Sequence, residues 1–174
     1  MRVYVRPLKR TDGQDPALYA MAQECPSVEN GFLNGAHGLS KHAFASWVLR
    51  QDEIARGVKL PPDFVRQTIY WLYDDDRPVG SAKLRYELTA ALRVEGGNIG
   101  YGIRPSERGK GYGRLLLGLM LQEAGRQGLE RVLVTINNDN LPSLRVARSN
   151  GGRLARQTEE RCYFWFDTPK EPLT

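Results

Sequence analysis

Pro105-Ser106-Glu107-Arg108-Gly109-Lys110-Gly111-Tyr112-Gly113 is the stretch that decides the fold of this chain. Residues 112–127 are mostly apolar, and their few polar residues fall on one i, i+4 row, so we predict a helix there. The three alternate glycines of the stretch leave the approach to this helix without Cβ atoms at those positions. A helix N-terminus carries about half a positive charge and unpaired N–H donors. Arg108 and Lys110 add positive charge beside it. The stretch therefore predicts a binding site for a pyrophosphate group.

Two common phosphate-binding motifs do not match this stretch. The glycines run Gly-x-Gly-x-Gly rather than Gly-x-Gly-x-x-Gly, and no acidic residue closes a strand about twenty positions later, as a dinucleotide fold requires. The mononucleotide P-loop needs Ser or Thr after its lysine, whereas Lys110 is followed by Gly111. Neither nucleotide class fits.

The surrounding sequence alternates strands and helices. Apolar, β-branched or alternating segments predict strands at residues 2–8, 64–73, 79–85, 98–104, 132–136 and 161–166. Ser40 is a good N-cap for a helix with Phe44, Trp47 and Val48 on one face, and a short helix should run from Asn140 to Gly151. We expect an α/β (α+β) fold in one domain, residues 1–174, with a mixed, mostly antiparallel central sheet of about six to seven strands flanked by helices.

Composition narrows the classes of partner. The chain has 174 residues, 41% of them hydrophobic and 26% charged, which is ordinary for a globular protein. Its net charge of +5 comes from basic residues scattered along the chain, so we expect no nucleic-acid partner. The longest apolar run, residues 115–121, is too short to cross a membrane, and the N-terminus lacks the apolar core of a signal peptide. Cys25 and Cys162 match no metal-ligand spacing, which indicates free thiols, a cytoplasmic location and no metal.

The chain resembles the GNAT superfamily of acyl-CoA N-acyltransferases. The family signature Arg/Gln-x-x-Gly-x-Gly/Ala is met by Arg108, Gly111 and Gly113, after a strand that ends Ile-Arg-Pro at Pro105. Asn140-x-x-Ser143 looks like the family's second cofactor motif, and residues 60–165 are similar to a branch of predicted acetyltransferases without an assigned substrate. The resemblance implies acetyl-CoA as co-substrate and a sheet that splits between its fourth and fifth strands.

The resemblance also implies a set of cofactor-binding residues. The backbone of the strand before the glycines would pair with the pantetheine arm, and the amides of the glycine-rich stretch would hold the pyrophosphate. Asn140 would contact pantetheine, or act as a plain N-cap, or both, and Ser143 would lie near the far end of CoA. These residues are Tyr101, Gly102, Ile103, Arg108, Gly109, Lys110, Gly111, Tyr112, Gly113, Asn140 and Ser143.

In this family a neutral amine attacks the thioester directly, so a base takes its proton and a main-chain donor on the fourth strand stabilises the oxyanion. Gly100 and Gly102 would allow a bulge that splits this strand from the next. Many relatives have a tyrosine acid where this chain has Ala147. Tyr163, Tyr101 or water would replace it, or the thiolate leaves unassisted. The missing tyrosine also leaves open a CoA-binding sensor without turnover.

The remaining catalytic candidates flank the predicted fourth strand. Glu95 and Glu87 are candidate bases or solvated loop charges, and Asn98 is a candidate for orienting substrate or water. Arg85 is either a solvated strand residue or a ligand for an anionic group of the acceptor. The acceptor is a small amine, an amino acid or a peptide N-terminus, and the protein a monomer or homodimer. Aromatic candidates for the acceptor cleft, or for the core, are Phe32, Trp47, Tyr86 and Trp165.

Overall fold

The computed structural model describes residues 2–170 and is built on two antiparallel β-sheets. In the first sheet, β4 (Gln67–Asp74) and β5 (Arg77–Arg85) form a central hairpin, as predicted. β1 (Val3–Pro7) pairs with β4 on one side, and β6 (Ile99–Ile103) pairs with β5 on the other. The strand order is therefore β1-β4-β5-β6, which leaves β6 at an edge.

The second sheet has the order β7-β9-β8, from β7 (Arg131–Asn137), β9 (Arg161–Asp167) and β8 (Arg153–Gln157). The two sheets together have seven strands, in agreement with the predicted number, and all their pairings are antiparallel. β8 was not predicted, because its sequence Arg-Leu-Ala-Arg-Gln has little apolar alternation and all five residues are exposed. A separate small hairpin of β2 (Val28–Glu29) and β3 (Phe32–Leu33) was also missed.

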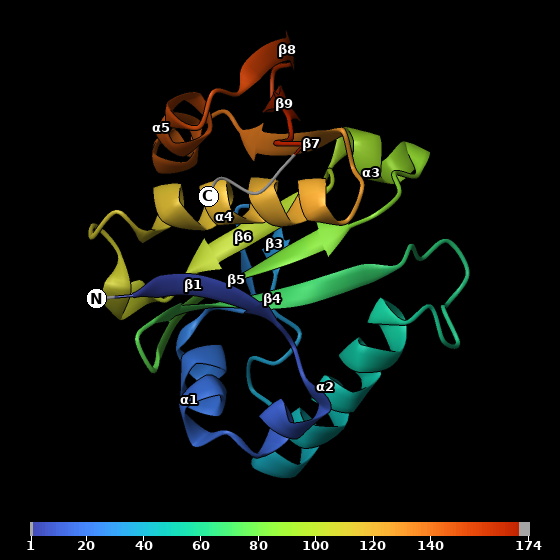
Figure 1. Ribbon diagram of the computed structural model, residues 1–174, viewed down its shortest axis with the longest axis vertical. Coiled ribbons are helices and arrows are strands. Elements are labelled where there is room, and N and C mark those ends of the chain that lie inside the picture. Colours follow the sequence, from blue (N-terminus) through green and yellow to red (C-terminus); the bar gives the residue numbers. More distant parts are fainter. Residues whose placement is uncertain (1, 171–174) are drawn as a thin grey trace.

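Helices cover both faces of the first sheet (Figure 1). α4 (Tyr112–Arg126) lies on one face, and α1 (Pro16–Glu24) and α2 (Lys41–Ala55) lie on the other. α5 (Leu141–Ser149) packs beside α4, and α3 (Ala90–Val94) is a single short turn before β6. Two 3-10 turns, η1 (Arg10–Gln14) and η2 (Pro105–Glu107), precede α1 and α4.

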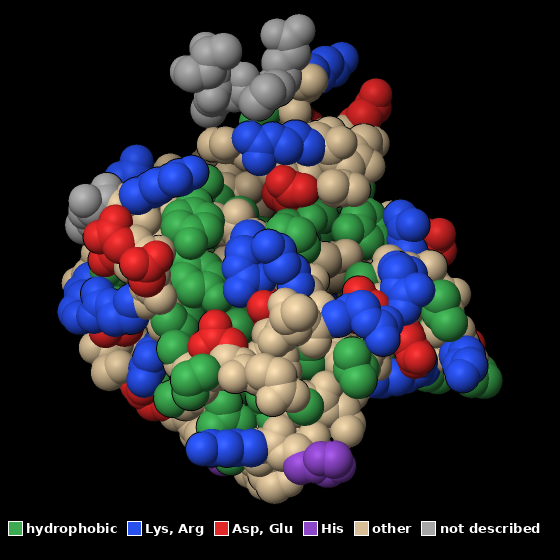
Figure 2. All heavy atoms as spheres, turned by 60° about the horizontal axis from the view of Figure 1, so that its bottom comes forward, with side chains coloured by type: hydrophobic (Ala, Val, Ile, Leu, Met, Phe, Trp, Pro, Cys, Tyr) green, Lys and Arg blue, Asp and Glu red, His purple; other side chains and the backbone are tan. Residues whose placement is uncertain are grey.

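The helix starts follow from local capping. The Ser40 hydroxyl accepts a hydrogen bond from the Ala43 amide at 3.2 Å, so α2 begins where the sequence predicts. Asn140 caps α5 in the same way. No helix within residues 2–170 is long and apolar enough to cross a lipid bilayer. On the face turned forward in Figure 2, which includes the helices at the bottom of Figure 1, basic side chains are interspersed with acidic ones.

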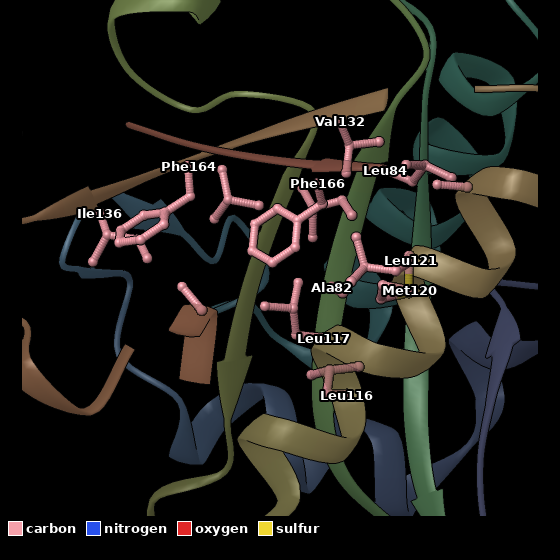
Figure 3. Close-up of a cluster of buried hydrophobic side chains, with 14 of the residues drawn as sticks. Ala82, Leu84, Leu116, Leu117, Met120, Leu121, Val132, Ile136, Phe164 and Phe166 are labelled. Carbon is pink, nitrogen blue, oxygen red and sulfur yellow. The ribbon is translucent and has the colours of Figure 1, made fainter. Parts of the chain in front are cut away.

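The main core lies between α4 and the two sheets (Figure 3). Phe164 and Phe166 of β9, Leu117 of α4 and Leu84 of β5 belong to this cluster, in which Phe166 points toward Leu117. All four side chains are at most 2% exposed. Since full burial of one such side chain contributes about 1.5–3 kcal/mol, this cluster holds both sheets against a single helix.

The two sheets meet at Asn98, just before β6. The Asn98 main-chain N–H turns away from β5 and donates to the Leu133 carbonyl at 2.8 Å, while the Leu133 N–H donates back to the Asn98 side-chain oxygen at 2.8 Å. The Asn98 side-chain NH2 then donates to the Arg85 carbonyl at 3.1 Å, which is where its own main-chain N–H would have bonded in a regular ladder. Beyond this point β6 and β7 have no pairing within the described chain. The predicted split is therefore confirmed.

The split does not come from a bulge at Gly100 and Gly102, and that prediction was wrong. β6 pairs with β5 in continuous register from Ile99 to Ile103. The two glycines instead make room for the Phe32 ring, which would lie 3.2–3.4 Å from a Cβ at either position. The strand thus diverges because Asn98 redirects its amide, and the glycines allow the β2–β3 hairpin to approach β6.

Asn98→Ala should lower the free energy of unfolding by at least about 2 kcal/mol, because it leaves the buried Leu133 N–H and Arg85 carbonyl without partners. Urea unfolding measures the change. The matched control is Gln157→Ala on exposed β8, expected to change stability by less than about 0.5 kcal/mol. Equal effects of the two substitutions would contradict the branch-point role of Asn98.

Candidate active site

A cleft of about 750 Å³ opens where β6 and β7 diverge. Its walls are the free edge of β6, the facing part of β7, the N-terminal ends of α4 and α5, and the β2–β3 hairpin. One end lies at the glycine-rich loop before α4, and the other end lies at the branch point beside Glu95 and Arg85. The five residues of β6 span about 13 Å between these ends.

The loop end has the geometry of an anion cradle. Gly109 and Gly111 line the cleft with positive φ angles of 77° and 86°, which L side chains rarely adopt. Nothing lies within 4 Å of a Cβ placed on either glycine, so the main chain is open to the cleft. Gly111 is the N-cap of α4 and has no side chain to accept from the first amides of the helix. The open main-chain N–H groups of this loop and of the first turn of α4 are donors that suit a pyrophosphate group.

Ion pairs hold the cradle from behind. Glu107 is buried, and its two oxygens accept from Arg77 and Lys110, both at 2.8 Å. The Lys110 ammonium is thereby turned toward Glu107, and Lys110 is not among the residues that line the cleft. Arg108 does line the cleft, and its guanidinium is bonded to Glu29 of the hairpin at 2.9 Å and to the Ile103 carbonyl at 3.1 Å. Positive charge is therefore fixed around the loop rather than mobile.

Tyr112 and Gly113, the last two residues of the stretch, serve mainly to place α4. The buried Tyr112 ring directs its hydroxyl to an Asp74 oxygen at 2.5 Å, which joins the start of the helix to β4. Gly113 lies against α5, where a Cβ would meet the Val146 side chain at 3.4 Å. Both residues line the cleft.

The free edge of β6 offers main-chain groups to the cleft. Arg85 donates to the Asn98 carbonyl and Arg104 donates to the Val79 carbonyl, so the even-numbered residues of this strand, Gly102 included, face β5. Because main-chain groups alternate along an antiparallel strand, those of Ile99, Tyr101 and Ile103 point to the open edge. Among the predicted cofactor residues, Tyr101 thus presents its main-chain N–H and carbonyl on that side, and Ile103 presents its N–H, because the Ile103 carbonyl accepts from Arg108.

The α5 wall brings Asn140 and Ser143 to the same cleft. The Asn140 side chain accepts from the Ser143 amide at 3.4 Å, so it is an N-cap and a cleft residue at once. The Ser143 hydroxyl is 2.7 Å from the Tyr101 hydroxyl. Burial raises the pKa of Tyr101 to about 12, with the Ser143 hydrogen bond acting in the opposite direction. Tyr101 is therefore a neutral hydroxyl at physiological pH.

The catalytic candidates separate into two groups. Glu95 lines the cleft, and Arg161 holds one of its oxygens at 2.9 Å. Glu87 is exposed and not part of the lining, Asn98 is used at the branch point, and the Tyr163 hydroxyl donates to the Val94 carbonyl at 2.9 Å behind the wall. Ala147, at the position of the family's tyrosine, is fully buried. Of the catalytic candidates, Glu95 and Tyr101 are thus the ones that line the cleft.

Sequence reasoning missed the hairpin wall and its charges. Of the four aromatic candidates, Phe32 alone lines the cleft. Asn30 and Gly31 both have positive φ, 48° and 79°, between the two short strands. An Asn-Gly pair is a strong hairpin signal and would have found this turn. The pairing of Glu29 with Arg108, 79 positions away, has no signal in the sequence.

Solved structures with the same fold include complexes with coenzyme A and with acetyl-CoA. The chain is similar to RimL, a ribosomal L7/L12 alpha-N-protein acetyltransferase in complex with coenzyme A (16% identity, TM-score 0.69, covering 97% of this chain and 96% of that one). It is similar to yncA of Salmonella typhimurium with its cofactor acetyl-CoA (14% identity, TM-score 0.61, 98% and 96% covered). It is also similar to the spermidine/spermine N-acetyltransferase SpeG of Vibrio cholerae (14% identity, TM-score 0.62, 95% and 95% covered).

No curated protein matches the chain in sequence. A family model does, however: the acetyltransferase (GNAT) domain matches residues 2–153, which include the cradle, the free edge of β6 and α5. The predicted family and co-substrate are thereby confirmed. This chain belongs to the GNAT acetyltransferase family and is an acyl-CoA-dependent N-acetyltransferase that uses acetyl-CoA.

Proposed function

We propose that this protein transfers the acetyl group of acetyl-CoA to the primary amine of a small molecule, an amino acid or a peptide. The observation that supports this most is the continuity of one cleft, which runs from the Cβ-free cradle at α4 along the free edge of β6 to the carboxylate of Glu95. An anion site, a strand edge and a carboxylate in that order match the three parts of the reaction: diphosphate, thioester arm and amine.

The cofactor-binding roles follow from the exposed groups. The amides of residues 108–113 bind the pyrophosphate, with Gly109 and Gly111 keeping the approach open. The main-chain N–H and carbonyl of Tyr101 and the N–H of Ile103 bind the amides of the pantetheine arm as an added strand would. Asn140 and Ser143 contact the arm from α5.

When bound, acetyl-CoA supplies an activated acyl carbon on a good leaving group. The amine nitrogen forms a bond to that carbon, the carbon–sulfur bond breaks, and the electron pair leaves with sulfur. Glu95 receives the proton that the amine loses, directly or through water. A main-chain N–H on the edge of β6 stabilises the oxyanion. The Tyr101 hydroxyl is positioned in the cleft to protonate the thiolate.

The similar proteins act on different amines. RimL is an acetyltransferase of a ribosomal protein N-terminus, and SpeG is a spermidine/spermine acetyltransferase. These names support an amine acceptor as a class without selecting one.

Purified protein with acetyl-CoA and a panel of amino acids, peptides and polyamines should release free CoA thiol over many turnovers with at least one acceptor. Thiol release followed with a chromogenic disulfide measures it. A rise in melting temperature with CoA, together with no thiol release above background for any amine, would identify a CoA sensor instead.

Gly111→Asp should weaken CoA binding at least tenfold, about 1.4 kcal/mol, because it puts a carboxylate and a Cβ into the cradle. Isothermal titration calorimetry measures the dissociation constant. Gly128→Asp is the matched control, since Gly128 has the same φ of 86° and equally open surroundings at the far end of α4. Equal affinity of the two variants would place the pyrophosphate elsewhere.

Glu95→Gln should lower kcat/KM at neutral pH by about 100-fold, in the range expected for loss of a general base. Steady-state kinetics with the best acceptor measures it, and the loss should shrink as pH rises and more of the amine becomes neutral. Glu87→Gln is the matched control, because it makes the same change on an exposed carboxylate outside the cleft. It should alter kcat/KM by less than about twofold, as expected for a surface substitution. Similar activity in both variants would exclude Glu95 as the base.

A further inference from the structure

Arg85 lies at the end of the cleft where the amine must enter. Its side chain is half-buried and lines the cleft. Its Nη1 donates to the carbonyls of Gly96 and Gly97, both at 3.3 Å, and lies 4.0 Å from where a Cβ on Gly100 would be. The guanidinium is therefore held beside Gly100 near the start of β6, on the face of the strand that the Phe32 ring also approaches.

Most of the hydrogen-bonding capacity of this guanidinium is unused. A guanidinium has five N–H donors, and the two on Nη1 are those with carbonyl partners. The donors on Nε and Nη2 have no protein partner within residues 2–170, and no carboxylate of that part of the chain lies within 4 Å of Arg85. Nε and Nη2 together form the edge of arginine that binds a carboxylate through two parallel hydrogen bonds.

The surrounding charges do not compensate Arg85. Glu95 is paired with Arg161, and Glu29 is paired with Arg108. The neighbouring cation, Lys83, lies on the same face of β5 and donates to the Leu33 carbonyl at 2.6 Å. Burial lowers the pKa of Lys83 to about 8, and the Arg85 charge acts in the same direction. Burial also lowers the pKa of Arg85. An excess of positive charge is therefore kept, partly desolvated, at this end of the cleft.

A desolvated cation without an anionic partner is costly, and a ligand that supplies the anion regains that cost on binding. We infer that the acceptor amine also carries a carboxylate, as an amino acid or short acidic peptide does, and that Arg85 binds this carboxylate while the amine faces Glu95. The inference rests on the proposed function and narrows it. It disfavours polyamines, because their second cationic group would meet Arg85.

Matched acceptors test this inference. Each amino acid of a panel is compared with its own amide, which keeps the amine and side chain and loses the carboxylate. Since the amine of the amide is the weaker base, more of it is neutral, so chemical reactivity alone favours the amide. We expect the opposite order, with kcat/KM at least tenfold higher for the best amino acid than for its amide, and no measurable transfer to spermidine.

Arg85→Gln should remove this preference, lowering kcat/KM for the amino acid at least tenfold while changing that for the amide less than about twofold, and Arg85→Lys should restore part of it. A merely structural role of Arg85 in holding Gly96 and Gly97 would lower both acceptors alike. Arg93→Gln, an exposed arginine of α3 outside the cleft, controls for the change in net charge.

The outcomes separate this inference from the proposed function. Turnover with a preference for amides or spermidine, or an unchanged preference in Arg85→Gln, overturns the role of Arg85 and leaves the acetyltransferase assignment intact. Absence of turnover with every amine overturns both.

Discussion

The structure depends on one constraint: buried main-chain N–H and carbonyl groups must have partners even where a sheet divides. At Asn98 the strand sends its own amide to Leu133 of β7, and the carboxamide side chain takes over the bond to Arg85 that the amide gave up. A single short amide side chain thus satisfies two main-chain groups, one in each sheet. If the Asn98 side chain did not replace this main-chain hydrogen bond, β6 would either continue the ladder with β5 or leave buried groups unpaired, and no cleft would open.

The division of the sheet and the glycine-rich loop together define the proposed cofactor site. Divergence exposes the main-chain N–H and carbonyl of Tyr101 and the N–H of Ile103, and Pro105 follows the strand so that the loop can turn into α4. α4 is held by apolar contacts to both sheets and by the Tyr112–Asp74 hydrogen bond, so the orientation of its N-terminus is set by the core. The anion cradle is therefore positioned by packing that lies outside the site.

Local sequence predicted α4, the cradle, the β4–β5 hairpin and the cap at Asn140, because each follows from propensity, capping or turn chemistry within a few residues. Residues that meet across the fold were not predictable in the same way. Nothing near Asn98 indicates that Leu133 will accept its amide, and the pairs Arg108–Glu29 and Arg161–Glu95 join segments 79 and 66 positions apart along the chain. Gly100 and Gly102 were assigned a bulge because their real neighbour, Phe32, comes from a distant hairpin.

In the proposed site, binding of the cofactor by main-chain groups at the open edge of β6 affects how far the sequence of this strand can change during evolution. Every residue type except proline presents the same N–H and carbonyl, so side-chain substitutions on this strand leave the proposed main-chain contacts to the cofactor in place. Such substitutions act instead through the two faces of the strand, one toward α4 and the other toward Phe32. In the proposed site the acyl donor is therefore held by groups that nearly all residue types share, and the side chains at the amine end, Phe32 and Arg85 among them, are left to determine the choice of acceptor.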